Sequence, residues 1–322
     1  MTDGLGYQDE RSHTAARAWR RLQPGGEPPR AIEALGATAQ SSVYRLHGMG
    51  STGTSIVAKR SYSSSIRVER VVYEEILPTL SLSALRCYGS VEDEDGRAWL
   101  FLEDAGGRPY SEDLPSDRVL AAKWLGAMHA ATADRHLAAT FPAVELDEYL
   151  DCLRLTRTYV LDHLTRRDHD GGSGKGFQRI LDHLDGLERC WCSIVTTWGQ
   201  MPHCLVHRDF IRSNVRVRDG ASGSTLHVID WGRAAWGVPA TDLAGLDFDA
   251  YWCEVRGRWS HFGRATIRTM ANLGDVLRYL DWMEGTGQYL ASSSNSEVVE
   301  MEADLLLYES LLARARITAG LL

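Results

Sequence analysis

Three oxygen-bearing side chains in the second half of the sequence have the types and the spacing that phosphoryl transfer requires. Asp209 and Asn214 lie five residues apart, and Asp230 follows Asn214 by sixteen residues. Mg²⁺ prefers few carboxylate ligands together with phosphate and water, and a separate carboxylate must orient the accepting hydroxyl. Asp230, helped by Asn214, suits the first task, and Asp209 suits the second. The set therefore predicts phosphoryl transfer from a nucleoside triphosphate.

Each of these residues also has an ordinary structural role when it is taken alone. An aspartate can cap a turn or end a strand, and an asparagine is common in loops. The joint pattern H-R-D-x-x-x-x-N followed by I-D-W-G is far more specific, because it is of the kinase type. The strand-like runs 215–218 and 225–229 can fold back as a hairpin, which would bring the three side chains together.

The stretches VHRDFIRSNV and VIDWGRAAWGVPATDLA resemble the paired motifs of the aminoglycoside phosphotransferase and choline kinase-like group. These are small-molecule kinases with the protein-kinase fold, and the resemblance covers most of residues 35–250. It implies that Asp209 is the catalytic aspartate and that Asn214 and Asp230 bind Mg²⁺. It also implies that Asp242 braces the catalytic loop from a helix below.

Two residues of these motifs bear on the branch of the family. Most members have Gly where Arg208 stands, whereas protein kinases have Arg there, so this residue keeps a protein-kinase function open. We expect Arg208 to pair with an acidic side chain of the loop. Trp231 stands where eukaryotic protein kinases usually have Phe, which favours the small-molecule branch.

The hydrophobic pattern predicts the elements that must position these residues. We expect an α+β, bilobal fold, with a small antiparallel-sheet lobe at 1–104 and a larger, mainly helical lobe at 105–322. The first lobe should contain a helix at 11–22, strands at 43–47 and 55–60, a helix at 66–77 and a strand at 98–102. Helices are expected in the second lobe at 117–133, 145–166, 177–198, 241–256, 262–285 and 296–315.

The protein-kinase fold requires a strand lysine that contacts the nucleotide phosphates and a glutamate that holds it. The chain has 32 Arg and only three Lys, and Lys59 is the only lysine of the first lobe. Its compact ammonium suits a phosphate contact, and Arg60 should point to the opposite face. Glu69, Glu74 and Glu75 are the candidate partners, and Glu69 is preferred because it precedes Tyr73 by four, as in the family's helix.

The rest of the nucleotide site is predicted partly by spacing and partly by resemblance. Ser41 and Ser42 resemble the family's Ser-rich nucleotide loop, whereas the glycines at 48–53 are too close to Lys59 and should form a hairpin tip. The stretch LFLEDAGG resembles the hinge whose backbone meets the base. It places Phe101, Glu103 and Ala105 near the nucleotide, with the bulk of Phe101 restricting the base pocket. ATP is the expected donor, with GTP as the alternative.

Two further lysines are expected to have no part in the chemistry. GGSGKG at 171–176 lacks the Ser or Thr and the preceding strand of a phosphate-binding loop, so Lys175 should be a loop lysine. Lys123 should lie on a solvated helix face.

The acceptor site is less sharply marked. Residues 247–259 should border it, where Asp247, Asp249 and Glu254 could attract a cation and Trp252 or Trp259 could stack on a sugar or cation. The formal net charge of -8 also favours a cationic acceptor. We expect a bacterial antibiotic or amino-sugar kinase that serves resistance or self-protection. A metabolite kinase acting on choline, an amino-alcohol or a biosynthetic intermediate is the alternative, and a catalytically dead binding module is a third.

Composition excludes other classes of protein. No apolar run reaches the roughly 18–20 residues of a membrane helix, and no basic block suggests nucleic-acid binding. The polar N-terminus lacks the apolar core of a secretory signal, and the six cysteines form no C-x-x-C pair. We therefore expect a cytoplasmic monomer or homodimer whose partners are small molecules, with no membrane or nucleic acid among them.

Overall fold

The computed structural model describes residues 13–49, 53–93, 95–133, 137–166, 173–221, 223–292 and 295–321. These residues form two compact units. The N-terminal unit is drawn from Met1–Ser111 and Asp209–Ala234, and the C-terminal unit from Glu112–Arg208 and Ala235–Leu322. The lobe boundary expected at residue 104 stays a prediction, while the compact units group Asp209–Ala234 with the N-terminal sheet.

An antiparallel five-stranded sheet forms the centre of the N-terminal unit. Its strands, in spatial order, are β1 (Ala31–Ala37), β2 (Ser42–Met49), β3 (Thr54–Tyr62), β5 (Arg97–Glu103) and β4 (Cys87–Glu92). The strands predicted at 43–47, 55–60 and 98–102 are confirmed as β2, β3 and β5. The edge strands β1 and β4 carry few buried side chains, so apolar alternation did not mark them. Residues 50–52, within the expected hairpin tip, lie outside the described residues.

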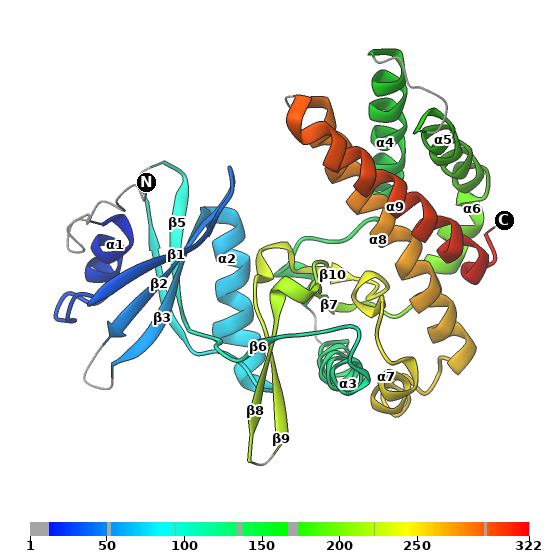
Figure 1. Ribbon diagram of the computed structural model, residues 1–322. Helices are drawn as coiled ribbons and strands as arrows, with labels where there is room; N and C mark the ends of the chain where they lie inside the picture. The colour runs from blue at the N-terminus through cyan, green and yellow to red at the C-terminus, as the bar shows by residue number, and fades with distance from the viewer. Residues whose placement is uncertain are drawn as a thin grey trace. The chain divides into compact units, whose positions relative to one another are not determined.

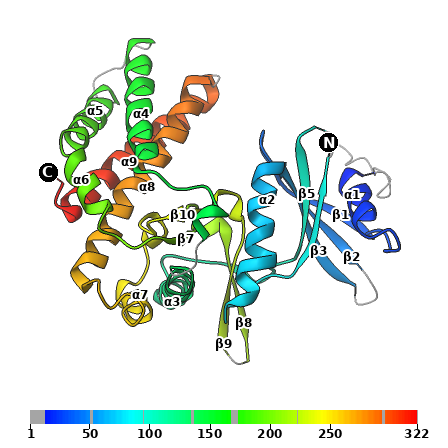
Figure 2. The same cartoon turned by 180° about the vertical axis from the view of Figure 1, so that it is seen from behind.

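Two helices cover opposite faces of this sheet (Figures 1 and 2). The first is α1 (Thr14–Leu22), whose Trp19 packs on Phe101 in a core cluster with Trp99. The second is α2 (Ser63–Val71), which continues through a π-helical turn at Val72–Ile76 and a 3-10 turn at Leu77–Thr79. The predicted helix at 66–77 therefore exists but begins earlier, and Pro78 lies in its last turn.

A smaller sheet in the same unit brings distant motif residues together. Strand β6 (Arg108–Pro109) pairs with β8 (Val215–Gly220), which pairs in turn with β9 (Gly223–Val228). The hairpin expected between the two motifs is confirmed, because Val215 lies opposite Val228 and Ile229 N–H donates to the Asn214 carbonyl at 2.9 Å. This pairing places Asn214 beside the segment that leads to Asp230.

The C-terminal unit is mainly helical, and α+β is therefore the fold class, as predicted. Its helices are α3 (Pro115–Thr132), α4 (Leu146–Arg166), α5 (Ser173–Arg189), α6 (Trp191–Trp198), α7 (Phe248–Val255), α8 (Arg264–Ser292) and α9 (Asn295–Ala319). Strand β7 (Cys204–Val206) pairs with β10 (Ala235–Gly237). Helix α8 packs against both α4 and α9, and α3 packs against α7 (Figure 1). No helix in the described part of the chain is apolar over a length that could cross a bilayer.

Several helix boundaries differ from the prediction. The helix expected at 177–198 is two helices, with a break at Cys190. Lys175 lies in the first turn of α5, so its assignment to a loop is wrong; Lys123 is exposed on α3, as expected. The segment expected to be helical at 241–256 starts with a 3-10 turn at Thr241–Leu243, and α7 begins only at Phe248. Asp242 thus lies in a tight turn and not in a longer helix.

We predict that Gly274→Ala destabilises the protein by about 2 kcal/mol or more, because overpacking is costly where backbone must move. A Cβ on Gly274 would meet the carbonyl oxygen of Ala240 at 1.9 Å. Gly285, on the same helix α8, has open space around it. Gly285→Ala should therefore stabilise by about 0.5–1 kcal/mol through helix propensity. Urea unfolding followed by circular dichroism measures both changes, and equal effects of the two variants would contradict this packing.

Candidate functional site

Lys59 forms a buried double ion pair on the inner face of β3. Its ammonium donates to Glu69 Oε1 of α2 and, at 2.6 Å, to Asp230 Oδ1, and its side chain is only 10% exposed. Glu74 and Glu75 are exposed, so among the three candidate glutamates Glu69 is the one that contacts Lys59. This lysine joins the sheet, helix α2 and the segment after the hairpin.

The electrostatics of this group keep the ammonium charged. Burial by itself disfavours the charged form of Lys59, but Glu69 and Asp230 outweigh it and raise the lysine pKa well above its ordinary value. Burial raises the pKa of Glu69, and the adjacent ammonium opposes that shift. Arg60, the next residue, instead binds Asp93 at 2.9 Å and Asp95 at 2.6 Å. The two neighbouring cations therefore have separate partners.

The segment around Asp230 is held in an unusual backbone conformation. Asp230 has φ 64° and ψ 61°, in the left-handed region that is costly for a side chain other than glycine. Gly232, two residues later, has no room for a side chain, since a Cβ there would lie 2.2 Å from Ser65 Oγ and 3.3 Å from Glu69 Oε1. The tight packing of α2 against this turn fixes the direction of the Asp230 carboxylate.

Asp209 and Asn214 are joined directly by hydrogen bonds. The Asn214 amide nitrogen donates to Asp209 Oδ2 at 2.8 Å and to the Asp209 carbonyl at 3.0 Å. The amide oxygen of Asn214 therefore points away from Asp209. All of the motif residues that we assigned to nucleotide chemistry lie in the N-terminal unit.

Oxygen atoms suited to Mg²⁺ are present at Asn214 and Asp230. The Asp230 side chain is 48% exposed, and its Oδ1 binds Lys59. Hard oxygen ligands in small number are what Mg²⁺ takes from a protein, with phosphate and water completing its shell. Within the described ranges no group of three or more His, Cys, Asp or Glu has a metal-binding arrangement. These donors fit a shared Mg²⁺–phosphate site and not an all-protein cage.

A cavity of about 570 Å³ lies beside Lys59 in the N-terminal unit. The apolar residues that line it are Leu35, Val43, Val57, Leu85, Leu102 and Ile229. Glu103, Ala105 and Ser41 also line it, together with Lys59 and Asp230. Its combination of an apolar slot, a backbone segment and a buried ammonium can accommodate a base at one part and phosphates at another.

Two residues predicted for the nucleotide site do not line this cavity. Phe101 is fully buried in the core beside Trp19, so the expectation that its side chain narrows the base pocket is wrong. Strand alternation explains the error, because Leu102 faces the cavity and its neighbour Phe101 must face α1. Ser42 likewise lines a separate cavity with Arg60, while Ser41 lines the one beside Lys59.

Two arginines that the sequence analysis missed hold the hinge segment. Arg45 of β2 donates to Asp104 Oδ2 at 2.6 Å. Arg218 of β8 donates to the carbonyls of Ala105 and Asp104, and to Glu103 Oε1 at 2.8 Å. Alternation along β2 could have indicated Arg45, but no local signal marks Arg218, because its role depends on the pairing of β6 with β8.

A buried carboxylate in the C-terminal unit fixes the backbone that precedes Asp209. Asp242 accepts hydrogen bonds from His207 N–H at 2.7 Å and Arg208 N–H at 2.8 Å, and His129 Nε2 lies 3.3 Å away. Burial acts to raise the Asp242 pKa, but these partners outweigh it and hold the pKa below its ordinary value. The bracing role implied for Asp242 has this geometric basis, from a 3-10 turn.

Arg208 occupies a position whose backbone favours glycine. Its φ is 69°, in the left-handed region, which explains why glycine suits this place. Its guanidinium pairs with Glu148 of α4 at 2.6 Å. We expect an acidic partner in the loop, and the structure instead provides one on helix α4.

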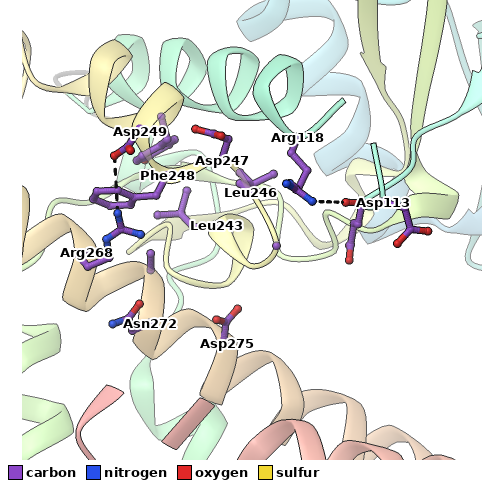
Figure 3. A pocket seen from close by; sticks show the side chains of 14 residues that line it. Asp113, Arg118, Leu243, Leu246, Asp247, Phe248, Asp249, Arg268, Asn272 and Asp275 are labelled. Carbon is purple, nitrogen blue, oxygen red and sulfur yellow. Dashed lines mark hydrogen bonds and ion pairs between the residues drawn. The ribbon is translucent and has the colours of Figure 1, made fainter. Parts of the chain in front are cut away.

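A second cavity, of about 640 Å³, lies within the C-terminal unit (Figure 3). Its charged lining residues are Glu112, Asp113, Arg118, Asp247, Asp249, Arg268 and Asp275. Asp247 caps α7 by accepting from Ala250 N–H at 2.8 Å. Figure 3 shows Asp249 beside Arg268, whose guanidinium stacks 3.3 Å from the centroid of the Phe248 ring. The excess of carboxylates gives this cavity a negative charge.

Two of the four residues expected at the acceptor site line this cavity. Asp247 and Asp249 do, but Trp252 is half-buried elsewhere and Glu254 packs beside Gly126 of α3. Trp259 is only 2% exposed and lies against Tyr251, so it cannot stack on a ligand. The helical period of α7 turns Glu254 away from the face that carries Asp249.

A family model and several solved structures match this chain. The model of the phosphotransferase enzyme family (APH) matches residues 57–273, which is more than half of the chain. No curated protein sequence gives a significant match.

Solved structures of similar fold include small-molecule kinases. The GDP and kanamycin complex of APH(2")-IIia shares 15% identity at a TM-score of 0.61, over 91% of this chain and 97% of that one. The ethanolamine kinase of Plasmodium vivax shares 11% sequence identity at a TM-score of 0.58, over 91% of this chain and 85% of that one. A microcompartment-associated aminopropanol kinase shares 15% sequence identity at a TM-score of 0.64, over 90% of this chain and 93% of that one. These likenesses confirm the predicted kinase-like fold.

We predict that Asp242→Asn lowers the free energy of unfolding at pH 7 by about 2–4 kcal/mol, because a buried charge with several hydrogen-bond partners is lost. The folded-state pKa of Asp242 is depressed, so its contribution is present above the unfolded pKa and is lost as the pH falls. The difference between wild type and variant should therefore shrink towards about pH 3. Urea unfolding across this pH range measures it. Asp185→Asn, at an exposed ion pair, is the control and should change stability little.

Proposed function

The chain belongs to the phosphotransferase enzyme family, and from this premise we propose that it transfers the γ-phosphoryl group of a nucleoside triphosphate to a hydroxyl of a small molecule. The observation that carries the proposal is the double ion pair of Lys59 with Glu69 and Asp230, beside the hydrogen-bonded pair of Asp209 and Asn214. A buried ammonium, carboxylate and amide oxygens for Mg²⁺, and a separate carboxylate are the groups that phosphoryl transfer needs.

Each of these residues has one role in the proposed reaction. Lys59 binds the α- and β-phosphates, and Glu69 holds its ammonium in place. Asp230 and Asn214 hold Mg²⁺, which neutralises phosphate charge when bound. Asp209 orients the acceptor hydroxyl and accepts its proton while the oxygen bonds to the γ-phosphorus and the bond to the β-phosphate oxygen breaks. Ser41 borders the phosphates, and Glu103 and Ala105 border the base.

We further propose that the cavity of the C-terminal unit receives an amine-bearing acceptor. Its lining includes five carboxylates and two guanidinium groups, which favours a cationic ligand. The segment that includes Asp242, which braces His207 and Arg208, continues directly into lining residues Leu243 and Asp247. Kanamycin, ethanolamine and aminopropanol, for which the similar structures are named, are all amines with hydroxyl groups. An antibiotic or amino sugar is our first choice, in bacterial resistance or self-protection.

A metabolite kinase acting on choline or another amino-alcohol is the second candidate. The fold is as similar to those of ethanolamine and aminopropanol kinases as to that of an aminoglycoside kinase, so it supports both candidates equally. A catalytically dead binding module is disfavoured, because Lys59, Asp209, Asn214 and Asp230 are all present and mutually placed within one unit.

A nucleotide-consumption screen tests the proposed function directly. Purified protein with Mg²⁺ and ATP or GTP is assayed against aminoglycosides, other antibiotics, nucleosides and amino-alcohols. We expect the highest turnover with an amine-bearing alcohol, and the product's ³¹P spectrum should show a phosphate ester. A preference for neutral nucleosides would contradict the cationic acceptor, and an absence of transfer to every compound would favour the binding module.

In the same assay, Asp209→Asn should lower turnover by about 10²–10⁴-fold, because the carboxylate that orients the hydroxyl and accepts its proton is lost. The affinity for ADP should remain within about threefold of wild type, since Asp209 holds neither the base nor Lys59. Asp219→Asn, on the exposed hairpin of the same unit, is the matched control and should retain full turnover. Undiminished turnover of the Asp209 variant would show that Asp209 is not the residue that accepts the proton of the hydroxyl.

A further inference from the structure

The hinge segment after β5, at Asp104 and Ala105, differs in the hydrogen bonding of its backbone donors and acceptors beside the cavity. Ala105 lines this cavity, and its N–H has no hydrogen-bond partner among the described residues. Its carbonyl oxygen, in contrast, accepts from Arg218 Nε, and the carbonyl of Asp104 accepts from Arg218 Nη2 at 2.7 Å. The hinge therefore offers a donor while two of its acceptors are already engaged.

Arg218 is itself fixed in this position. Its Nη2 also binds Glu103 Oε1 at 2.8 Å, and the arginine side chain is only 33% exposed. Glu103 Oε2 is in turn 3.2 Å from the N–H of Arg86. Arg218 does not line the cavity, whereas Arg216, two residues earlier on β8, does. The carbonyl of Ala105 is thus directed to a group outside the cavity wall.

The two purine bases need different partners from such a segment. Adenine presents an acceptor at N1 and a donor at its 6-amino group. Guanine presents an acceptor at O6 and donors at N1 and its 2-amino group. The free N–H of Ala105 can serve adenine N1 or guanine O6, but guanine N1–H then requires an acceptor beside that N–H. The carbonyl of the same residue is the nearest candidate, and Arg218 engages it.

We propose that Arg218 is a specificity-determining residue of the donor site, which selects adenine over guanine nucleotides by engaging the carbonyls of Ala105 and Asp104. Adenine can still use the N–H of Ala105 and the backbone carbonyl of Glu103 two residues earlier. Arg218 holds the Ala105 carbonyl towards itself, so that guanine N1–H meets no acceptor directed at it, and a buried donor without a partner is costly. The inference rests on the proposed use of a nucleoside triphosphate.

The test measures nucleotide affinity alone and needs no acceptor. Isothermal titration calorimetry with Mg²⁺ gives the dissociation constants of ADP, GDP and IDP for wild type and for Arg218→Met. Wild type should bind ADP about tenfold or more tightly than GDP. In Arg218→Met this ratio should fall at least about fivefold, chiefly through tighter GDP binding. IDP shares O6 and N1–H with guanine but lacks the 2-amino group, so it should follow GDP.

Arg108→Met is the matched control. Arg108 lies on the paired strand β6 and contacts Asp219 at 3.4 Å. The Arg108→Met variant should have the same ratio of ADP to GDP affinity as wild type. If Arg218→Met fails to fold by circular dichroism, Arg218→Lys decides, because a lysine can retain only part of the forked contact and should relax the ratio partly.

The outcomes separate this inference from the proposed function. Equal or tighter binding of GDP by wild type, or an unchanged ratio in a folded Arg218 variant, would overturn the role of Arg218. If wild type bound ADP and GDP in the expected ratio but transferred phosphate to no hydroxyl, only the proposed function would fail. Wild type that bound no nucleotide would overturn both.

Discussion

The buried ammonium of Lys59 is the constraint on which the N-terminal unit depends. A charge that is only 10% exposed is stable only where opposite charges compensate it, and here Glu69 and Asp230 do so. The lysine and its two partners come from three separate segments: the sheet, helix α2 and the turn after the β8–β9 hairpin. The cost of leaving the ammonium unpaired thus couples the fold of the unit to the placement of the carboxylate proposed to hold Mg²⁺.

The backbone at the two motifs has an unusual conformation that the surrounding contacts hold in place. Among the described residues, Arg208 and Asp230 are the non-glycine residues with positive φ, and each lies in or beside a motif. Strain of this kind persists only where surrounding contacts fix it. Asp242 does so for Arg208 through two backbone N–H groups, while Lys59 and the tight packing at Gly232 do so for Asp230. Each compact unit therefore contains one strained residue and the contacts that hold it.

Sequence reasoning was strongest where chemistry is local. The spacing of Asp209, Asn214 and Asp230 predicted their hairpin, and the scarcity of lysine drew attention to Lys59. It failed where the answer depends on which face of an element is buried, as for Phe101, Ser42 and Trp259. It also missed Arg45 and Arg218, because their partners in the hinge lie 59 and more than 100 residues away in the chain. Strand alternation bears on Phe101 and Arg45, whereas the role of Arg218 depends on the pairing of β6 with β8, which no local pattern encodes.

The central claim is that Lys59 is a nucleotide-binding ammonium whose shape as well as charge is required. In a chain whose other basic residues are nearly all arginine, Lys59→Arg keeps the charge and changes only the shape. Calorimetric titration of this variant with a non-hydrolysable ATP analogue and Mg²⁺ is the most direct test. We predict an affinity at least about tenfold weaker than that of wild type, because a guanidinium is too large for the space between Glu69 and Asp230. Wild-type affinity in a folded Lys59→Arg protein would contradict the account.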